Sequence, residues 1–500
     1  MRGDAYRRLW NKVREFQPDS LLRAIASVGA ARIRNPNRLT QLFGPHLSNP
    51  EHALPDFVLS ELVKIAIQIE PRPYVRQERV PAARDLAYLQ QLYLDVDAET
   101  QMQQLEDLEI FMFRLAALQF PSQGGLWQLI PRTLLLHTAF HASDKRDFDV
   151  PMRFEEALGL SLADYTFLGV SLFALGMASK DGQLHIEHLQ QVKLPVLEPT
   201  NISKFLDLVT TDFETFRREC AERCHPIPDL EIYEYNPLVA RPVVRLGDGT
   251  YVLPIPRLLV ERVTSGVYYE LAERFGDPFL TYLGHAFQNY IGMLFSDIDG
   301  LDLLPEAEYG PKRSRRLSPD WILVNEGGAA LLECKSKRLR LGSRLPQLRQ
   351  QLEQDLRGGI STAVSQLQKS INDIRQKLVY PQLAQARLVP LVATLDHAFL
   401  LNGNPVRQIV LSHLRSMGLD PIDYQVASVE ELEYLAALGH GGNMLNILFA
   451  KSEALDAREY DLATAIRDNG GFQKHPLLER TYREFIAQMG LSGKPNGASG

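Results

Sequence analysis

Residues 318–337 restrict the fold more than any other segment, because they carry the pattern of a β-hairpin. An apolar run from Trp321 to Val324 is followed by a glycine-containing turn, Asn325 to Gly328, and by a second apolar run, Ala329 to Leu332. Both faces of this hairpin are apolar: Ile322, Val324 and Leu331 on one face, and Trp321, Leu323 and Leu332 on the other. Strands of this kind are covered by other elements on both sides. The segment therefore predicts a strand pair inside a core.

Apart from Glu326 in the turn, the charged residues of the hairpin gather at its open end, with Asp320 entering the first strand and Glu333 and Lys335 leaving the second. If the turn centres between Glu326 and Gly327, facing residues have numbers that add to 653, so Asp320 lies opposite Glu333. Directly opposed residues have Cβ atoms about 4.5–5.5 Å apart. Side chains alternate between faces, so Lys335 shares the face of Glu333. We therefore expect two carboxylates and one amine to converge.

Such a convergence suits a particular chemistry. Like charges beside an apolar core are unfavourable unless they are paired, and Lys335 can offset only one of the two carboxylates. Mg²⁺ binds through one or two carboxylates and holds a phosphate as well, and a nearby lysine can orient a metal-bound water. The layout favours metal-assisted phosphodiester hydrolysis. The alternative is an ordinary solvated ion cluster on a surface hairpin.

These residues resemble the signature of the PD-(D/E)XK, or restriction-endonuclease-like, nuclease superfamily. The signature reads Pro319-Asp320, twelve intervening residues, then Glu333-Cys334-Lys335, and the resemblance covers roughly residues 277–430. The common core of that superfamily is a helix, a three-stranded meander, a helix and a strand. The sequence pattern supplies expected elements in that order: a helix at 279–295, strands at 301–304, 321–324 and 329–332, a long helix at 345–378, a strand at 388–395, a helix at 405–417, a strand at 424–428 and a helix at 429–438.

The resemblance implies a role for each motif residue. Asp320, Glu333 and Lys335 would be catalytic; Asp320, Glu333 and the backbone carbonyl of Cys334 would bind Mg²⁺ or Mn²⁺. Gln366, on the long helix, and Lys337 would be auxiliary site residues.

The first helix departs from the family pattern. Many members carry a glutamate there, but the matching place in this chain is Gln288, within Phe287-Gln288-Asn289-Tyr290. Gln288 can hydrogen-bond a metal-bound water but brings no negative charge. Three alternatives remain open: Glu306 or Glu308 supplies a third carboxylate, or the site binds metal more weakly, or the site is not catalytic.

Basic residues surround the motif. Residues 311–349 contain ten Lys and Arg against three acids, in a chain whose net charge is −7. A basic rim around an acidic metal site would suit a phosphate backbone, whereas a solvated charge run is the other interpretation. The predicted nucleic-acid-binding residues are Lys312, Arg313, Arg315, Arg316, Arg338 and Arg340.

The length of 500 residues and the apolar content of 45% allow two or three domains with their own cores. The expected fold class is a multidomain α+β or α/β chain. Residues 1–225 are predicted to be a mainly helical recognition or regulatory region, with helices near 19–30, 55–69, 84–94, 98–118, 125–142, 153–178 and 201–223. Residues 226–276 are a proline-rich connector or small β-subdomain, 277–438 the nuclease-like domain, and 439–500 a helical region with a disordered tail from 492.

The expected compartment is the cytoplasm. Three cysteines do not make a disulfide framework, and the N-terminal residues lack the apolar core of a signal peptide. The longest apolar stretch, Tyr165 to Ala178, is shorter than the ~20 residues that a membrane helix requires. His137 and His141 share a helical face at metal-ligand spacing, but packed or hydrogen-bonded histidines are the favoured interpretation.

The sequence thus predicts a Mg²⁺-dependent nuclease whose expected substrate is DNA. Defence against phage or other foreign DNA is an analogy with what superfamily members often do. A homo-oligomer or a partner from a defence system remains open. One alternative is a catalytically inactive nuclease-like fold that binds nucleic acid or acts as a scaffold. Another is a protein-interaction module whose helical half is the functional part.

Overall fold

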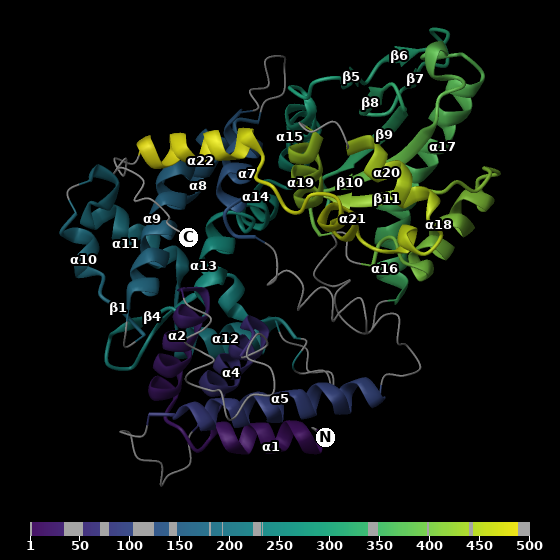
Figure 1. Cartoon of the computed structure of the whole chain (residues 1–500). Coiled ribbons are helices and arrows are strands. Elements are labelled where there is room, and N and C mark those ends of the chain that lie inside the picture. Colours follow the sequence, from purple (N-terminus) through teal and green to yellow (C-terminus); the bar gives the residue numbers. More distant parts are fainter. Residues whose placement is uncertain are drawn as a thin grey trace.

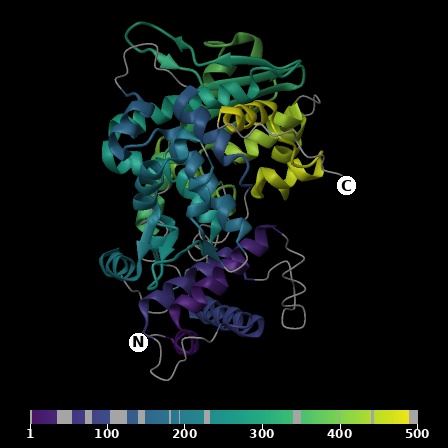
Figure 2. The same cartoon turned by 90° about the vertical axis from the view of Figure 1, so that its left-hand side faces the viewer.

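The computed structural model describes residues 3–34, 54–70, 80–103, 125–139, 148–179, 182–192, 194–223, 232, 234–338, 349–397, 400–439 and 444–488. Within these ranges the chain has a mixed α+β fold in which helices predominate, as the sequence predicted. The N-terminal helices lie at one end of the molecule and the largest sheet lies at the other (Figures 1 and 2).

The largest sheet has five strands in the order β11-β10-β9-β8-β5. Their bounds are β5 (Asp302–Pro305), β8 (Trp321–Asn325), β9 (Gly328–Lys335), β10 (Leu388–Thr394) and β11 (Gln425–Ser428). β5, β8 and β9 form an antiparallel meander, whereas β9, β10 and β11 run parallel. Trp321 pairs with Leu332 and Asn325 with Gly328, so the predicted register of the hairpin is confirmed.

Both faces of the hairpin are covered, as the sequence predicted. Ile322 and Leu331 join one buried cluster, together with apolar residues of α17 (Thr362–Arg375) and α18 (Asn404–Ser416). Leu323 and Leu332 join a second cluster with α15 (Asp277–Phe295), α19 (Val429–Gly439) and α20 (Met444–Glu453). The alternation of side chains along each strand thus places helices on both sides of this sheet (Figure 1).

Each segment expected from 279 to 438 is present among the described residues, with 345–348 at the start of the predicted long helix lying outside them. The predicted long helix consists of α16 (Arg349–Leu356), a π-helical turn, η10 (Arg357–Ser361), and α17. The turn contains Gly358 and Gly359, where a break or kink was expected. α19 begins with a capping box in which the Ser428 hydroxyl accepts from the Glu431 N–H at 3.3 Å and Glu431 accepts from the Ser428 N–H at 2.7 Å.

A short two-stranded arm interrupts the meander between β5 and β8. It consists of β6 (Glu308–Tyr309) and β7 (Arg316–Leu317), which pair antiparallel. Its base is fixed to α17, because Asp373 accepts hydrogen bonds from the Tyr309 hydroxyl at 2.6 Å and from Arg316 at 2.6 and 2.8 Å.

The N-terminal part is mainly helical, as predicted, with differences in detail. Its helices are α1 (Asp4–Val13), α2 (Pro18–Arg34), α4 (Asp56–Gln68), α5 (Ala83–Gln103), α7 (Leu129–Leu134), η5 (Leu135–Ala139), α8 (Val150–Leu158), α9 (Leu162–Ala178), α10 (Glu187–Gln190), η6 (Pro195–Leu197), α11 (Pro199–Val209) and α12 (Phe213–Arg223). The expected helix at 153–178 is in fact two, because Gly159 ends α8 in the left-handed conformation and Ser161 caps α9. The prediction of a single helix at 201–223 was also wrong, since β2 (Thr210–Asp212) separates α11 from α12. The helices expected at 84–94 and 98–118 are continuous, because α5 runs without a break to residue 103; residues 104–118 lie outside the described residues.

Residues 226–276 were expected to be a connector or a small β-subdomain. The hairpin signal at Gly247-Asp248-Gly249 joins β3 (Val243–Arg245) to β4 (Tyr251–Val252), as predicted. These strands form one sheet with β1 (Gln183–Leu184) and β2, in the order β1-β4-β3-β2. The hydrogen-bonded sheet therefore crosses the predicted boundary at 225. The same segment also contains η8 (Pro237–Val239), α13 (Pro256–Val263) and α14 (Val267–Phe275).

The remaining elements are η11 (Pro381–Leu383), η12 (Ala457–Glu459), α21 (Leu462–Asp468) and α22 (Pro476–Gln488). The tail from 492 lies outside the described residues. Among the described helices, none is by itself long and apolar enough to cross a membrane; α8 and α9 meet the length and composition test together, but are bent by 61°.

Candidate functional site

Asp320 lies one residue before β8, directly opposite Glu333 when the pairing of Trp321 with Leu332 is extended by one step. One Asp320 carboxylate oxygen accepts a hydrogen bond from the Cys334 N–H at 2.6 Å. The neighbouring Trp321 fixes this strand end, because its indole N–H donates to the Gln288 carbonyl of α15 at 2.7 Å. Gly292 permits this approach, since a Cβ there would lie 2.3 Å from the Trp321 ring.

Lys335 ends β9 and completes the cluster. Its Nζ lies 3.2 Å from a Glu333 carboxylate oxygen and 2.9 Å from the side-chain oxygen of Gln366. Gln366 projects from α17, which covers this face of the sheet. The structure thus brings together Asp320, Glu333, Lys335 and Gln366, four residues that the sequence placed in the site.

Glu333 is buried and Asp320 is partly buried, and the positive charge beside them is too small to offset both carboxylates. Burial, followed by the negative charge of Asp320, raises the pKa of Glu333 to about 7. Burial also raises the pKa of Asp320, although the Cys334 N–H and Lys335 act in the opposite direction. Glu333 is only 5% exposed. A cation between these carboxylates would favour their ionised forms, which is the electrostatic requirement for a metal site.

A third oxygen donor comes from the backbone. The Lys335 carbonyl accepts a hydrogen bond from Leu395 on the β10 side of β9. Successive carbonyls of a strand point to opposite edges, so the Cys334 carbonyl points to the edge that carries Asp320. No group of three or more His, Cys, Asp or Glu side chains able to hold a metal occurs within the described ranges. Two carboxylates and one carbonyl nevertheless fit Mg²⁺, which keeps several waters and needs few protein ligands.

Glu306, rather than Glu308, is the further acid near this pair. The negative charge of Asp320 contributes to raising the pKa of Glu306, after burial, and Glu306 in turn acts on Glu333. Its backbone N–H donates to the Asp320 carbonyl at 3.1 Å. Both glutamates are exposed, but Glu308 lies on β6 and pairs with Arg315 at 2.5 Å. Between the two alternatives that the sequence left open, the structure brings Glu306 to the site.

The first helix contributes a histidine that the sequence analysis missed. His285 of α15 is among the groups whose charge lowers the pKa of Asp320 against the effect of burial. It precedes Gln288 by three residues, so both lie on one helical face. The sequence carries the signal, because His285 lies one helical turn before Gln288, the position that matches the family's glutamate. Gln288 itself takes part through its backbone carbonyl, which holds Trp321.

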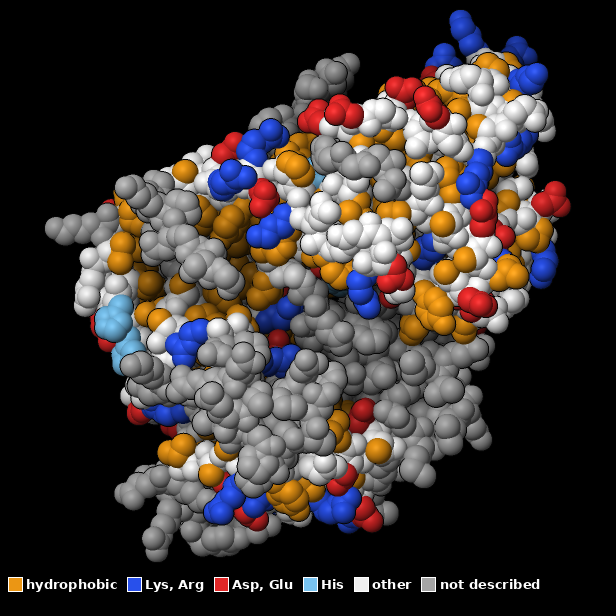
Figure 3. All heavy atoms as spheres, viewed as in Figure 1, with side chains coloured by type: hydrophobic (Ala, Val, Ile, Leu, Met, Phe, Trp, Pro, Cys, Tyr) orange, Lys and Arg blue, Asp and Glu red, His pale blue; other side chains and the backbone are white. Residues whose placement is uncertain are grey.

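The predicted basic residues differ in their exposure and in their ion pairs. Lys312 and Arg313 are exposed at the tip of the β6–β7 arm, and Lys337 is exposed two residues after Lys335. Figure 3 shows Lys and Arg side chains gathered at this end of the molecule. Arg315 and Arg316 are also exposed, but they pair with Glu308 and Asp373.

The prediction for Arg338 was wrong. Its side chain is only 11% exposed, pairs with Asp396 at 3.3 Å, and lies over the rings of Tyr268 and Tyr269 at 4.8 and 5.3 Å. Because these contacts bury the guanidinium, Arg338 is not an exposed phosphate-binding residue of the kind that the sequence predicted. Arg340 lies outside the described residues.

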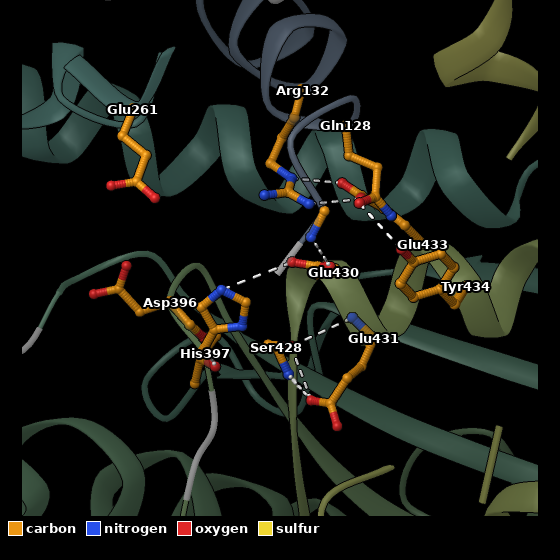
Figure 4. A network of polar contacts seen from close by, with 12 residues as sticks. Gln128, Arg132, Glu261, Asp396, His397, Ser428, Glu430, Glu431, Glu433 and Tyr434 are labelled. Carbon is orange, nitrogen blue, oxygen red and sulfur yellow. Dashed lines mark hydrogen bonds and ion pairs between the residues drawn. The ribbon is translucent and has the colours of Figure 1, made fainter. Parts of the chain in front are cut away.

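A second group of charged residues joins the helical part to the sheet (Figure 4). Arg132 of α7 donates to both oxygens of Glu433 on α19, at 2.6 and 2.7 Å. The Tyr290 hydroxyl of α15 donates to the same carboxylate at 2.5 Å. Glu430, one turn earlier on α19, accepts from the Gly125 N–H at 3.1 Å and lies 3.7 Å from His397. Arg132, Tyr290, Glu430 and Glu433 are buried, whereas the His397 side chain is 30% exposed, and the network lies where β10 and β11 end.

No protein-family model, curated protein or solved structure matches this chain. The geometry and electrostatics of the Asp320–Glu333–Lys335 site are therefore what points to a function.

Proposed function

We propose that this protein is a Mg²⁺-dependent nuclease with a restriction-endonuclease-like core, and that it hydrolyses phosphodiester bonds in DNA. The observation that carries this proposal is the convergence of Asp320, Glu333 and Lys335 at the end of a buried hairpin, with both carboxylates short of positive charge. The exposed Lys312 and Arg313 on the neighbouring arm support a polyanionic substrate.

In this proposal Asp320, Glu333 and the Cys334 carbonyl would hold the ion. When bound, Mg²⁺ would stabilise charge on the phosphoryl oxygens and lower the pKa of a coordinated water. Lys335 is held between Glu333 and Gln366, so its ammonium group is fixed beside the metal position. From there it orients the attacking water and stabilises developing negative charge. Gln366, which lies on α17, accepts a hydrogen bond from Lys335 and so holds its side chain in place.

A second candidate is a nuclease-like protein that binds nucleic acid without cutting it. The specific observation in its favour is that α15 presents His285 and Gln288 on the face near Asp320, where the resembling family often has a glutamate. With one carboxylate fewer, the site would bind a divalent ion more weakly. Both candidates would bind nucleic acid, but only the nuclease would cut it.

The deciding experiment is a cleavage assay with the purified full chain on single-stranded DNA, duplex DNA and RNA. Cleavage of DNA with Mg²⁺ or Mn²⁺, and its loss with a chelator, would support the nuclease. Binding of the substrates without cleavage under either ion would support the second candidate. Cleavage of RNA alone would contradict the proposed substrate class.

Lys312 and Arg313 are expected to contact phosphates without reading bases. The double variant Lys312→Ala/Arg313→Ala should weaken DNA binding to a similar extent for every sequence tested. It should also reduce the slope of log K against log salt by about 1 for each lost phosphate contact. Filter binding or fluorescence anisotropy across a salt series measures both quantities, with Glu333→Gln as the background so that the DNA stays intact.

Arg480→Ala/Arg483→Ala is the matched control. Both arginines are exposed on α22, at another part of the surface, and their removal changes the net charge by the same amount. If the two double variants weaken DNA binding equally, the loss comes from the change in net charge alone, which would contradict a role for the arm.

The raised pKa of Glu333 predicts a specific pH dependence. Between pH 4.5, the ordinary value for Glu, and about pH 7, folded Glu333 holds a proton that the unfolded chain has lost. Its contribution to stability therefore decreases as pH rises through this window, and is constant above it. In a chelating buffer, the melting temperature of the wild type relative to Glu333→Gln should fall from pH 5 to pH 8. A flat difference across this range would contradict the burial argument.

Mg²⁺ should reverse that trend, because the ion binds the ionised carboxylates. The rise in melting temperature on adding Mg²⁺ is expected to be larger at pH 8 than at pH 6, and to disappear in Glu333→Gln.

A further inference from the structure

A cavity of about 30 Å³ lies where the helical part meets the segment that follows β9. Its polar lining includes Arg132 of α7, His137 of η5, Thr264 and Ser265 of the α13–α14 turn, and Arg338. All the charged side chains that line it are arginines. About 10–15 Å³ of such space is needed for one water, so this cavity has room for roughly two waters or one compact anion.

His137 is the feature that points to a ligand. It is 4% exposed, and its Nδ1 has no hydrogen-bond partner among the described residues. Burial, followed by the positive charge of Arg338, lowers the pKa of His137 to about 4, so the ring is neutral at pH 7 and carries one N–H donor. Its position in a π-helical turn is a second signal, because such turns often occur at functional sites. A buried polar atom without a partner is unfavourable, and a ligand would supply the missing bond.

Arg132 and Arg338 each have a guanidinium nitrogen that is not used in a hydrogen bond among the described residues and can donate to such a ligand. Arg132 uses Nε and Nη2 for Glu433, and Figure 4 shows its remaining nitrogen pointing away from that carboxylate. The Nε of Arg338 has no hydrogen-bond partner within the described ranges, although Asp396 lies 3.3 Å away. Glu433 and Asp396 hold their arginines but are not part of the cavity lining.

We propose that this cavity is a binding site for a compact oxyanion, of the size and charge of inorganic phosphate. Guanidinium groups match the oxygens of such an anion, and the imidazole N–H of His137 adds a third donor. This site does not depend on the nuclease proposal, because Asp320, Glu333 and Lys335 do not line it.

The test uses the full chain in phosphate-free buffer with a chelator, so that no metal bound at Asp320 and Glu333 contributes. Inorganic phosphate should bind saturably in isothermal titration calorimetry and raise the melting temperature, whereas chloride at equal ionic strength should not. The variant His137→Phe should weaken phosphate binding at least about tenfold, which corresponds to the loss of one charge-assisted hydrogen bond. It should also raise the melting temperature of the ligand-free protein, because it removes an unpartnered buried nitrogen while keeping a ring beside Phe279.

Arg245→Gln is the control, because Arg245 lines a separate polar pocket of about 210 Å³ near α11 and α12. Phosphate affinity should be unchanged in this variant. If His137→Phe does not fold, Ser265→Leu, which fills the cavity from the α13–α14 turn, should abolish binding instead. The absence of saturable phosphate binding, or equal binding by wild type and the folded cavity variant, would overturn the proposal. A cavity that holds only waters in crystals soaked with phosphate would do the same.

Discussion

Replacing Lys335 by alanine is expected to reduce the rate of DNA cleavage by about 10²–10⁴-fold at saturating Mg²⁺, the usual size of an effect from a positioned proton-transfer group. The ammonium group of Lys335 contacts Glu333 and Gln366. Removal therefore takes away the cation beside the carboxylates without opening the apolar core. Single-turnover cleavage of a labelled duplex, together with circular dichroism of the variant, measures the effect and confirms folding.

Lys337→Ala is the matched control: the resemblance made Lys337 an auxiliary site residue, but it is exposed, and Lys335 rather than Lys337 contacts Glu333 and Gln366, while both substitutions change the charge equally. It should cleave at nearly the wild-type rate. The cleavage rate of Gln366→Ala should fall between those of Lys335→Ala and Lys337→Ala, since this substitution removes only the group that holds Lys335. If Lys335→Ala and Lys337→Ala cleave at the same rate, Lys335 has no catalytic role.

The second large effect is expected in stability, from the ion pair between Arg132 and Glu433. Glu433 has a side chain 1% exposed, and it accepts from Arg132 through two hydrogen bonds and from Tyr290 through a third. Arg132→Met leaves this carboxylate buried without its cation, which typically costs about 3–5 kcal/mol. Urea denaturation followed by circular dichroism gives the change in free energy of unfolding.

The double variant Arg132→Met/Glu433→Gln should recover much of that loss, because no uncompensated charge remains buried. Its glutamine can still accept the hydrogen bond from Tyr290. A loss below about 1 kcal/mol in Arg132→Met, within the range of an exposed ion pair, would contradict the burial of this network.

The hairpin and its site could be predicted from the sequence because they depend on short-range rules. The alternation of apolar residues and the position of the turn determine the register between Trp321 and Leu332, and that register alone places Asp320 opposite Glu333. The helices from α15 to α19 also follow their apolar periodicity. Even the π-helical turn coincides with Gly358-Gly359, where local propensity is weakest.

Features that depend on long-range contacts could not be predicted in this way. Arg132 and Glu433 are 301 residues apart, and neither has a local signal that separates a buried charge from a solvated one. Arg338 stands in a basic run, yet contacts with Tyr268, Tyr269 and Asp396 bury it. β2 divides a helical pattern because pairing with β3 outweighs the local propensity of three residues.

The most direct test of the central claim is a Mn²⁺ titration followed by electron paramagnetic resonance on the wild type, Asp320→Asn, Glu333→Gln and Glu308→Gln. If Asp320 and Glu333 share one divalent ion, each of their variants should weaken Mn²⁺ binding at least about tenfold. Glu308→Gln removes an equally charged residue that pairs with Arg315 outside the cluster, and its affinity should equal that of the wild type. Unchanged Mn²⁺ affinity in both Asp320→Asn and Glu333→Gln would contradict the claim.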